Sequence, residues 1–142
     1  MRIYLDNCCY NRPYDDQTNL RISLETQAKL KVQEEIKAGK HELVTSYMLR
    51  YEYSKNLYEM RRNQIMDFIK NNTFAYVTDK NREEYDKKAS EIMKQGVHYK
   101  DAIHIACAIA AKCDYLLTTD DRMLRFKSDE IKVVSPIDFI VL

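Results

Sequence analysis

The sequence predicts a three-layer α/β/α fold with a mainly parallel central sheet. Short apolar runs alternate with helical patterns along the whole chain, and this alternation is typical of parallel sheets that helices cover on both faces. A chain of 142 residues is long enough to bury a sizeable core, and we see no internal repeat, linker or low-complexity segment. We therefore expect one domain over residues 1–142.

The expected elements follow from the spacing of apolar residues and from residues that start or end helices. The strands are short apolar runs, and they span residues 3–5, 42–45, 74–77, 115–118 and 131–134. The helices between them span residues 18–38, 62–70, 81–95 and 99–112, with another directly after Ser46. Ser46 can cap that helix, and Ser135-Pro136 opens a final helical turn.

Three segments lead to more detailed expectations. Residues 7–17 should form a polar loop, because Pro13 and the two aspartates that follow it favour turns. In the helix at residues 18–38 every fourth residue is apolar, which predicts one buried stripe made of Leu20, Leu24, Ala28, Val32 and Ile36. The helix at residues 99–112 is apolar almost all round, and such a helix is normally buried.

Composition excludes several classes of protein. With two glycines the chain has neither of the glycine-rich phosphate-binding motifs. The net charge of +1 provides no basic field over the whole molecule, so nucleic acid would have to bind at local patches. The four cysteines lack the spacing of a zinc site. Because we see no signal-peptide pattern and no membrane-spanning apolar run, we expect a cytoplasmic protein with reduced thiols and no membrane partner.

Four acidic residues from separate segments are candidates for one site. Asp6 follows the first strand directly, and Asp120 lies two residues beyond the fourth. Glu52 lies nearly two turns into the helix after Ser46, and Asp101 is in the first turn of the buried helix. Sites on open parallel sheets form beyond the carboxyl ends of the strands. Carboxylates gathered there repel one another unless a divalent cation neutralises them, and Mg²⁺ and Mn²⁺ prefer such oxygen ligands.

Several short motifs, taken in order, resemble those of one family. They are LDNCC at the start, Ser46 to Glu52, KDAIHIACA at 100–108, LLTTDD at 116–121 and VVSPIDF at 133–139. Together they resemble the PIN-domain nucleases, and most of all the small ribonucleases that are toxins of prokaryotic toxin–antitoxin pairs. The resemblance runs over essentially the whole chain and implies a PIN-like fold.

The resemblance also implies roles for individual residues. The four acids of the family match Asp6, Glu52, Asp101 and Asp120, which would be the catalytic residues and would hold one or two Mg²⁺ or Mn²⁺ ions. A water would then attack an RNA phosphodiester while the metal stabilises the developing charge. The hydroxyl residue two before the last acid matches Thr118, and Asn7 stands where the family usually has Thr or Ser. An antitoxin partner and a homodimer are implied as well.

Some alternatives remain open at this stage. Asp121 competes with Asp120 for the fourth acidic position; the spacing from Thr118 selects Asp120 as ligand and leaves Asp121 to cap the following helical turn. His104 lies three residues after Asp101, where it could be a second metal ligand. We prefer a hydrogen-bonded core histidine at that position.

The segment after Asp6 supports two interpretations equally. Arg12 and Arg21 could pair with nearby aspartates and order a loop, or together with Asn11 they could bind substrate phosphate. The function also has a rival. A PIN-like module without catalytic activity, binding RNA or protein, would fit the near-neutral charge and Asn7, although the complete set of acids argues against it.

Overall fold

The computed structural model describes residues 1–142 and contains one five-stranded sheet, all of whose pairings are parallel. The strand order is β3-β2-β1-β4-β5. The strands are β1 (Arg2–Leu5), β2 (Glu42–Ser46), β3 (Thr73–Val77), β4 (Tyr115–Leu117) and β5 (Lys132–Val134). The helices are α1 (Asn7–Asn11), α2 (Leu20–Lys37), α3 (Tyr47–Ser54), α4 (Glu59–Asn72), α5 (Arg82–Met93), α6 (Tyr99–Ala110), α7 (Asp121–Leu124) and α8 (Pro136–Ile140). Two 3₁₀ turns, η1 (Arg12–Tyr14) and η2 (Asp79–Asn81), complete the list.

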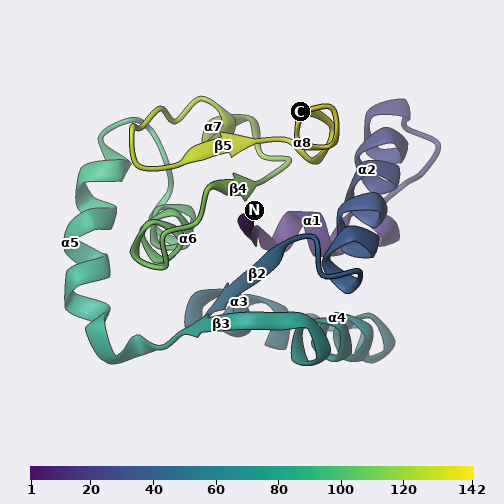
Figure 1. The fold of residues 1–142 in the computed structure, drawn as a ribbon, viewed down its shortest axis with the longest axis horizontal. Helices are drawn as coiled ribbons and strands as arrows, with labels where there is room; N and C mark the ends of the chain where they lie inside the picture. Colours follow the sequence, from purple (N-terminus) through teal and green to yellow (C-terminus); the bar gives the residue numbers. More distant parts are fainter.

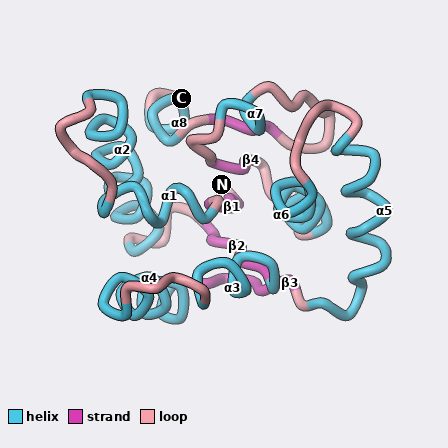
Figure 2. The backbone as a smooth tube through the Cα atoms, turned by 180° about the vertical axis from the view of Figure 1, so that it is seen from behind, coloured by secondary structure: helices cyan, strands magenta, loops and turns pink.

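The sheet is the middle of three layers. In Figure 1, α5 and α6 lie on one side of the strands, and α1, α2 and α4 lie on the other. The same separation is visible from behind in Figure 2. The predicted α/β/α arrangement is therefore confirmed, and all five predicted strands exist, each with one end shifted by one residue.

The central strand β1 explains why both faces need helices. Ile3, Tyr4 and Leu5 are all fully buried, so consecutive side chains that point to opposite faces are covered on each. Burying one side chain of this size contributes about 1.5–3 kcal/mol. The apolar helix α6 is buried as predicted, with Ile103 and Ile105 fully inaccessible. None of the helices combines the length and apolar character needed to cross a membrane.

The expected polar loop at residues 7–17 is wrong for its first eight positions. Asn7–Asn11 form α1 and Arg12–Tyr14 form η1, and α1 buries Cys9 and Tyr10 completely. The helix begins here because Asp6 is its N-cap, with a carboxylate that accepts the backbone N–H of Asn7. An aspartate that ends a strand can start a helix as readily as a turn.

The predicted buried stripe of α2 is wrong in its first half. Leu20 and Leu24 are 73% and 45% exposed, whereas the last three residues of the stripe, Ala28, Val32 and Ile36, are buried as expected. Around the middle of the helix, buried positions belong to polar residues instead, namely Glu25, Thr26 and Lys29. The first half of α2 packs on η1 through polar contacts, because Arg12 donates to Glu25 and Thr26 donates to the Arg12 carbonyl.

Candidate active site

Asp6 is both a helix cap and the centre of a polar cluster at the carboxyl edge of the sheet. Its Oδ1 accepts the Asn7 N–H at 2.8 Å. Its Oδ2 accepts the Thr118 hydroxyl at 3.0 Å and the Cys8 thiol at 3.2 Å. Only 5% of the residue is exposed. These contacts hold the carboxylate of Asp6 in one orientation at the junction of β1 and β4.

Glu52 reaches this cluster from the last turn of α3. The helix starts where Ser46 accepts the N–H of Leu49, as predicted, and this cap sets the direction of α3. The Glu52 carboxylate contacts Nε2 of His104 directly, and that same nitrogen lies 3.8 Å from Oδ1 of Asp6. Asp6, Glu52 and His104 can therefore offer three ligand atoms that all lie within 4.8 Å of one another.

His104 is completely buried, and both of its ring nitrogens have partners. Nδ1 lies 2.5 Å from the hydroxyl of Tyr4, which lies 2.6 Å from Oγ of Ser46. Burial lowers the pKa of His104, but the hydrogen bond to Glu52 and the charge of Asp6 outweigh burial and raise the pKa above 6.5. The preferred interpretation of a hydrogen-bonded core histidine agrees with this burial and these contacts, yet Nε2 also faces the acids.

Asp101 is the acid whose ionisation is most disturbed. It lies in the first turn of α6, as predicted, and its carboxylate has no hydrogen-bond partner. Burial and then the negative charge of Asp6 raise the pKa of Asp101 to about 6, and the charges of Asp120 and Glu52 act in the same direction. The other three predicted acids are therefore close enough to repel the Asp101 carboxylate.

Asp120 is placed differently from the expectation in one respect. Its Oδ1 accepts the N–H of Arg122 at 2.8 Å, so Asp120 is the N-cap of α7. The expected capping role of Asp121 is wrong, because Asp121 instead accepts from Arg21 at 2.8 Å. Asp120 is the better cap because its backbone is extended, whereas Asp121 is the first helical residue.

The acids lack the cationic partners that surface carboxylates often have. None of the four forms an ion pair with Lys or Arg; His104 is the single basic side chain in contact with them. Several carboxylate oxygens with one imidazole nitrogen form a donor set that fits a divalent cation. The residues therefore suit the Mg²⁺ or Mn²⁺ that the resemblance implies.

The predicted supporting residues divide into two groups. Thr118 is fully buried and holds Asp6, as its place beside the acids suggested. The Asn7 and Asn11 side chains do not contact the acids: the amide of Asn11 donates to the carbonyl of Asn7 and to its side-chain oxygen. Cys8 is the second side chain that donates to Asp6.

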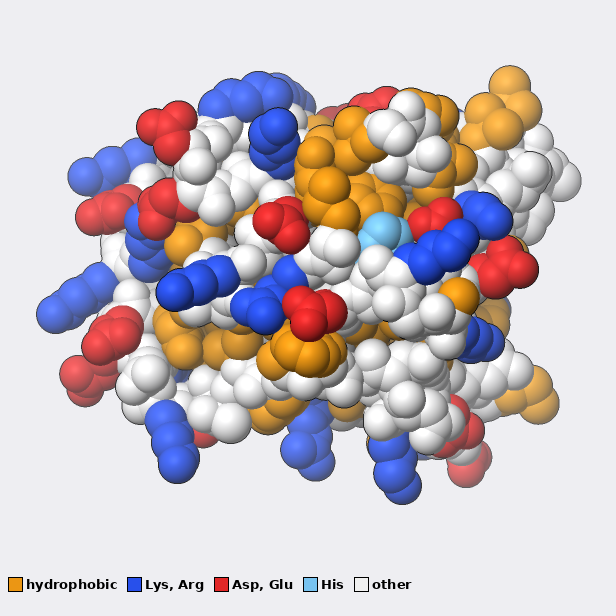
Figure 3. All heavy atoms as spheres, in the orientation of Figure 1, with side chains coloured by type: hydrophobic (Ala, Val, Ile, Leu, Met, Phe, Trp, Pro, Cys, Tyr) orange, Lys and Arg blue, Asp and Glu red, His pale blue; other side chains and the backbone are white.

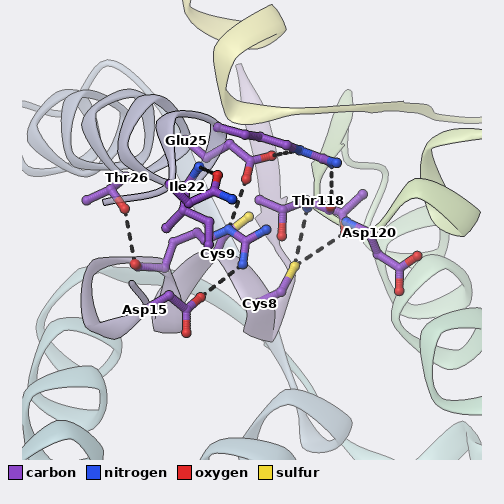
Figure 4. Close-up of polar contacts among 12 residues, drawn as sticks. Cys8, Cys9, Asp15, Ile22, Glu25, Thr26, Thr118 and Asp120 are labelled. Carbon is purple, nitrogen blue, oxygen red and sulfur yellow. Dashed lines mark hydrogen bonds and ion pairs between the residues drawn. The ribbon is translucent and has the colours of Figure 1, made fainter. Parts of the chain in front are cut away.

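Arg12 and Arg21 are engaged in ion pairs beside the cluster. Arg12 donates to Asp15 and Glu25, both at 2.9 Å, and Figure 4 labels these two acids and marks both contacts with dashed lines. Arg21 donates to Glu25 and Asp121 and to the carbonyl of Thr119. The interpretation as an ordered segment agrees with these contacts. A role of either arginine in holding phosphate stays a prediction.

Sequence reasoning missed the buried partners of the histidine. Tyr4 lies within a run of strand residues, and nothing in its neighbours indicates that its hydroxyl faces α6. The Asp-x-x-His spacing did place His104 on the face of Asp101, and it was the one available signal.

Comparison with known proteins finds likeness in structure alone. A scan against protein-family models gives no match, and a search of curated proteins gives none. A chain in the crystal structure of VapBC2 from Rickettsia felis, bound to a DNA fragment from their promoter, is similar with a TM-score of 0.57 and 14% identity. A chain of FitAcB from Neisseria gonorrhoeae is similar with a TM-score of 0.58 and 17% identity. Each comparison covers 94% of this chain and 97% of the other.

These likenesses define the class of fold to which the chain belongs. It is a parallel α/β/α sandwich that the solved structures share over nearly their whole length. More narrowly, it is the PIN-like fold, so the resemblance predicted from the motifs is confirmed for the fold. At such low identity the likeness does not extend to activity.

Proposed function

We propose that this protein is a metal-dependent endoribonuclease that hydrolyses RNA phosphodiester bonds, and that it is the toxin of a toxin–antitoxin pair. One observation carries the proposal. Carboxylates that follow β1, lie in α3 and cap α7 act electrostatically on the carboxylate of Asp101 in α6, and none of the four is neutralised by Lys or Arg. Repulsion between carboxylates lowers the stability of the fold, so it serves no structural purpose. In a cation-dependent site, the bound cation neutralises it.

In this proposal the acids bind the cation, and two neighbouring side chains orient Asp6. Asp6, Glu52, Asp101 and Asp120 hold the cation, and Thr118 and Cys8 orient Asp6. A bound Mg²⁺ or Mn²⁺ supplies a neutralising charge for the phosphate and activates water for attack. Because no side-chain nucleophile is required, the work of the chain is to position oxygen atoms and to leave room for the phosphate.

The side chains next to Glu52 and Asp101 in the chain are suited to a single-stranded polyanion. Tyr51 is 44% exposed, and the ammonium groups of Lys55 and Lys100 lie 4.3 and 5.2 Å from its ring centre. Tyr51 and Lys100 also line one pocket together with Tyr99. An aromatic face beside two cations can stack a base and attract its phosphates.

This local pair of lysines matters because the net charge of +1 provides no basic field over the molecule as a whole. Figure 3 shows Lys and Arg interspersed with Asp and Glu over one face of the molecule, in keeping with the net charge of +1. We infer that RNA is guided by a few local cations near the acids. Binding should accordingly weaken only moderately as salt is raised.

The partners in this proposal are an antitoxin and a second copy of the chain, in the cytoplasm. The support is the sequence resemblance to toxins and the shared fold with VapBC2 and FitAcB. An adjacent open reading frame for a small DNA-binding protein, and co-purification of its product with this chain, would support the toxin role. Light scattering of the purified chain tests the homodimer.

The activity is tested with purified protein and labelled single-stranded RNA, with Mg²⁺, Mn²⁺ or EDTA. We expect cleavage with either metal and none in EDTA. Asp6→Asn and Asp101→Asn should abolish cleavage yet remain folded by circular dichroism. Asn is as good a helix cap as Asp at position 6, and the side chain of Asp101, in the first turn of α6, makes no hydrogen bond that the substitution would remove. Cleavage that persists in EDTA and survives both substitutions would refute the proposal.

The rival is a PIN-like module that binds RNA or protein without cleaving it. It is favoured by Asn7, which stands at a motif position yet whose side chain accepts from Asn11 and makes no hydrogen bond with the acids. Calorimetry with Mn²⁺ separates the two functions. Heat of binding that disappears in Glu52→Gln supports the nuclease, whereas no heat above dilution supports the inactive module.

A further inference from the structure

The position of His104 raises a question about the chemical nature of the cation site. PIN-like acids are oxygen donors, but here a fully buried imidazole lies among them. Its Nε2 contacts Glu52 and lies 3.8 Å from Asp6. The nitrogen and these two carboxylates thus lie close enough together for one cation to bind all three.

The opposite ring nitrogen fixes the orientation of the imidazole. Nδ1 lies 2.5 Å from the Tyr4 hydroxyl, which lies 2.6 Å from Ser46 Oγ. When the Tyr4 proton is directed to Ser46, the Tyr4 oxygen accepts Nδ1–H. The lone pair of the neutral ring is then at Nε2, facing the acids. Histidines that bind metals usually donate their other ring N–H to an oxygen in this way.

The two other histidines of the chain have no such arrangement. His41 lies 2.9 Å from Glu35 at the end of α2, and His98 contacts Arg122. Neither contacts any of the four acids, so His104 alone could bring nitrogen to this site.

We propose that His104 is a nitrogen ligand of the cation, and that the site therefore selects Mn²⁺ or a later divalent transition metal over Mg²⁺. The inference rests on the proposed function because it concerns the same site. Mg²⁺ keeps to oxygen ligands in near-ideal octahedral geometry, whereas imidazole is a ligand for transition metals. Tyr4 and Ser46 act as positioning residues that hold the ring.

The decisive measurement is pulsed electron paramagnetic resonance on the intact protein loaded with Mn²⁺. We expect a nitrogen hyperfine coupling that changes when only histidine is labelled with ¹⁵N. His41→Gln is the matched control and should leave the coupling unchanged. Because this measurement uses the wild-type chain, it does not depend on a variant at a buried position.

Two variants extend the test. His104→Asn should remove the coupling and bring the dissociation constants for Mn²⁺ and Mg²⁺ closer together by about 10-fold or more. Tyr4→Phe retains the ring without the Nδ1 partner, so the coupling should persist while Mn²⁺ binds about 10-fold more weakly. Competition of Mg²⁺ against bound Mn²⁺ gives these ratios.

The outcomes separate this inference from the proposed function. Mn²⁺ that binds without nitrogen coupling in the wild-type protein overturns the inference, and the four-acid site survives. A ratio of Mn²⁺ to Mg²⁺ affinity that His104→Asn leaves unchanged also overturns it. If Mn²⁺ does not bind at all, both the inference and the proposed metal site are wrong.

Discussion

Replacing Asp101 by Asn should stabilise the metal-free protein. The carboxylate has no hydrogen-bond partner and is surrounded by the charges of Asp6, Asp120 and Glu52. The amide of Asn has almost the same shape and no charge. The substitution therefore removes repulsion without removing a contact, which is the reverse of what most substitutions at buried polar positions do.

The size and the pH dependence of this effect follow from the pKa. Folding raises the pKa of Asp101 from 3.8 to about 6, and two pKa units correspond to about 3 kcal/mol. Because the side chain is partly exposed, screening by solvent reduces this to about 1–2 kcal/mol. Between the two pKa values the folded protein binds more protons than the unfolded one. The penalty is therefore absent below about pH 4 and complete above about pH 6.

The assay is urea unfolding of wild type and Asp101→Asn in EDTA, at pH 4.5 and 7.5. We expect the variant to be more stable by about 1–2 kcal/mol at pH 7.5 and by clearly less at pH 4.5. Asp138→Asn is the matched control, since Asp138 is an exposed first-turn residue of α8. Its replacement should cost a few tenths of a kcal/mol through the helix dipole.

Adding Mn²⁺ should reverse the order of stability. A cation that binds only the folded wild type stabilises it by RT ln(1 + c/Kd), where c is the free Mn²⁺ concentration, and the variant, which has lost one ligand, has a larger Kd. The reasoning is refuted if Asp101→Asn is no more stable than wild type in EDTA at pH 7.5. It is also refuted if the advantage of the variant does not change with pH.

Three further predictions concern burial, ion pairing and RNA. Burial lowers the pKa of Lys29 to about 8, so Lys29→Met should raise the free energy of unfolding by about 2–3 kcal/mol at pH 7. Wild type should become more stable between pH 8 and 10.5, and the variant should not, as measured by urea unfolding. Arg12→Ala should cost about 2 kcal/mol or more by weakening the pairing of buried Glu25, and adding Glu25→Gln should restore at least half of it in a double-mutant cycle. Tyr51→Ala should weaken binding of single-stranded RNA about 5-fold or more in EDTA, measured by fluorescence anisotropy. Phe74→Ala, which also removes an exposed aromatic ring, should not.

The sheet was predictable because its signal is local and strong. Apolar runs such as Ile3 to Leu5 belong to strands covered on both faces, where nearly every side chain is apolar. Caps such as Ser46 and Ser135 were predictable for the same reason, since a cap depends on the next three residues. Which residues the first half of α2 buries was not predictable. Glu25 is buried there because it pairs with Arg12, and no periodicity encodes which distant residue supplies a counter-charge.

The four acids could be identified from the sequence, but their contacts and positions could not be predicted from it. Strand ends and family spacing suggested all four, whereas the cap of α7 depends on whether the chain turns at Asp120 or Asp121. That choice is decided by tertiary contacts, because Arg21 holds Asp121 from the side. The contact of Tyr4 with His104 joins residues 100 positions apart, and no pattern within one segment predicts such a pair.

The fold compensates part of the negative charge of the four acids and leaves the remainder for a bound cation. Asp6 and Asp120 each cap a helix, and Asp101 lies in the first turn of another, where the helix dipole favours an anion by about 0.3–1 kcal/mol. Glu52 is near the end of its helix, where the dipole is unfavourable, and it alone of the four contacts His104 directly. Each negative charge thus has its own partial compensation. The compensation remains incomplete, since the pKa of Asp101 is still about 6. A bound divalent cation is the one component that would act on all four charges at once, and the residual repulsion is part of what would make its binding favourable.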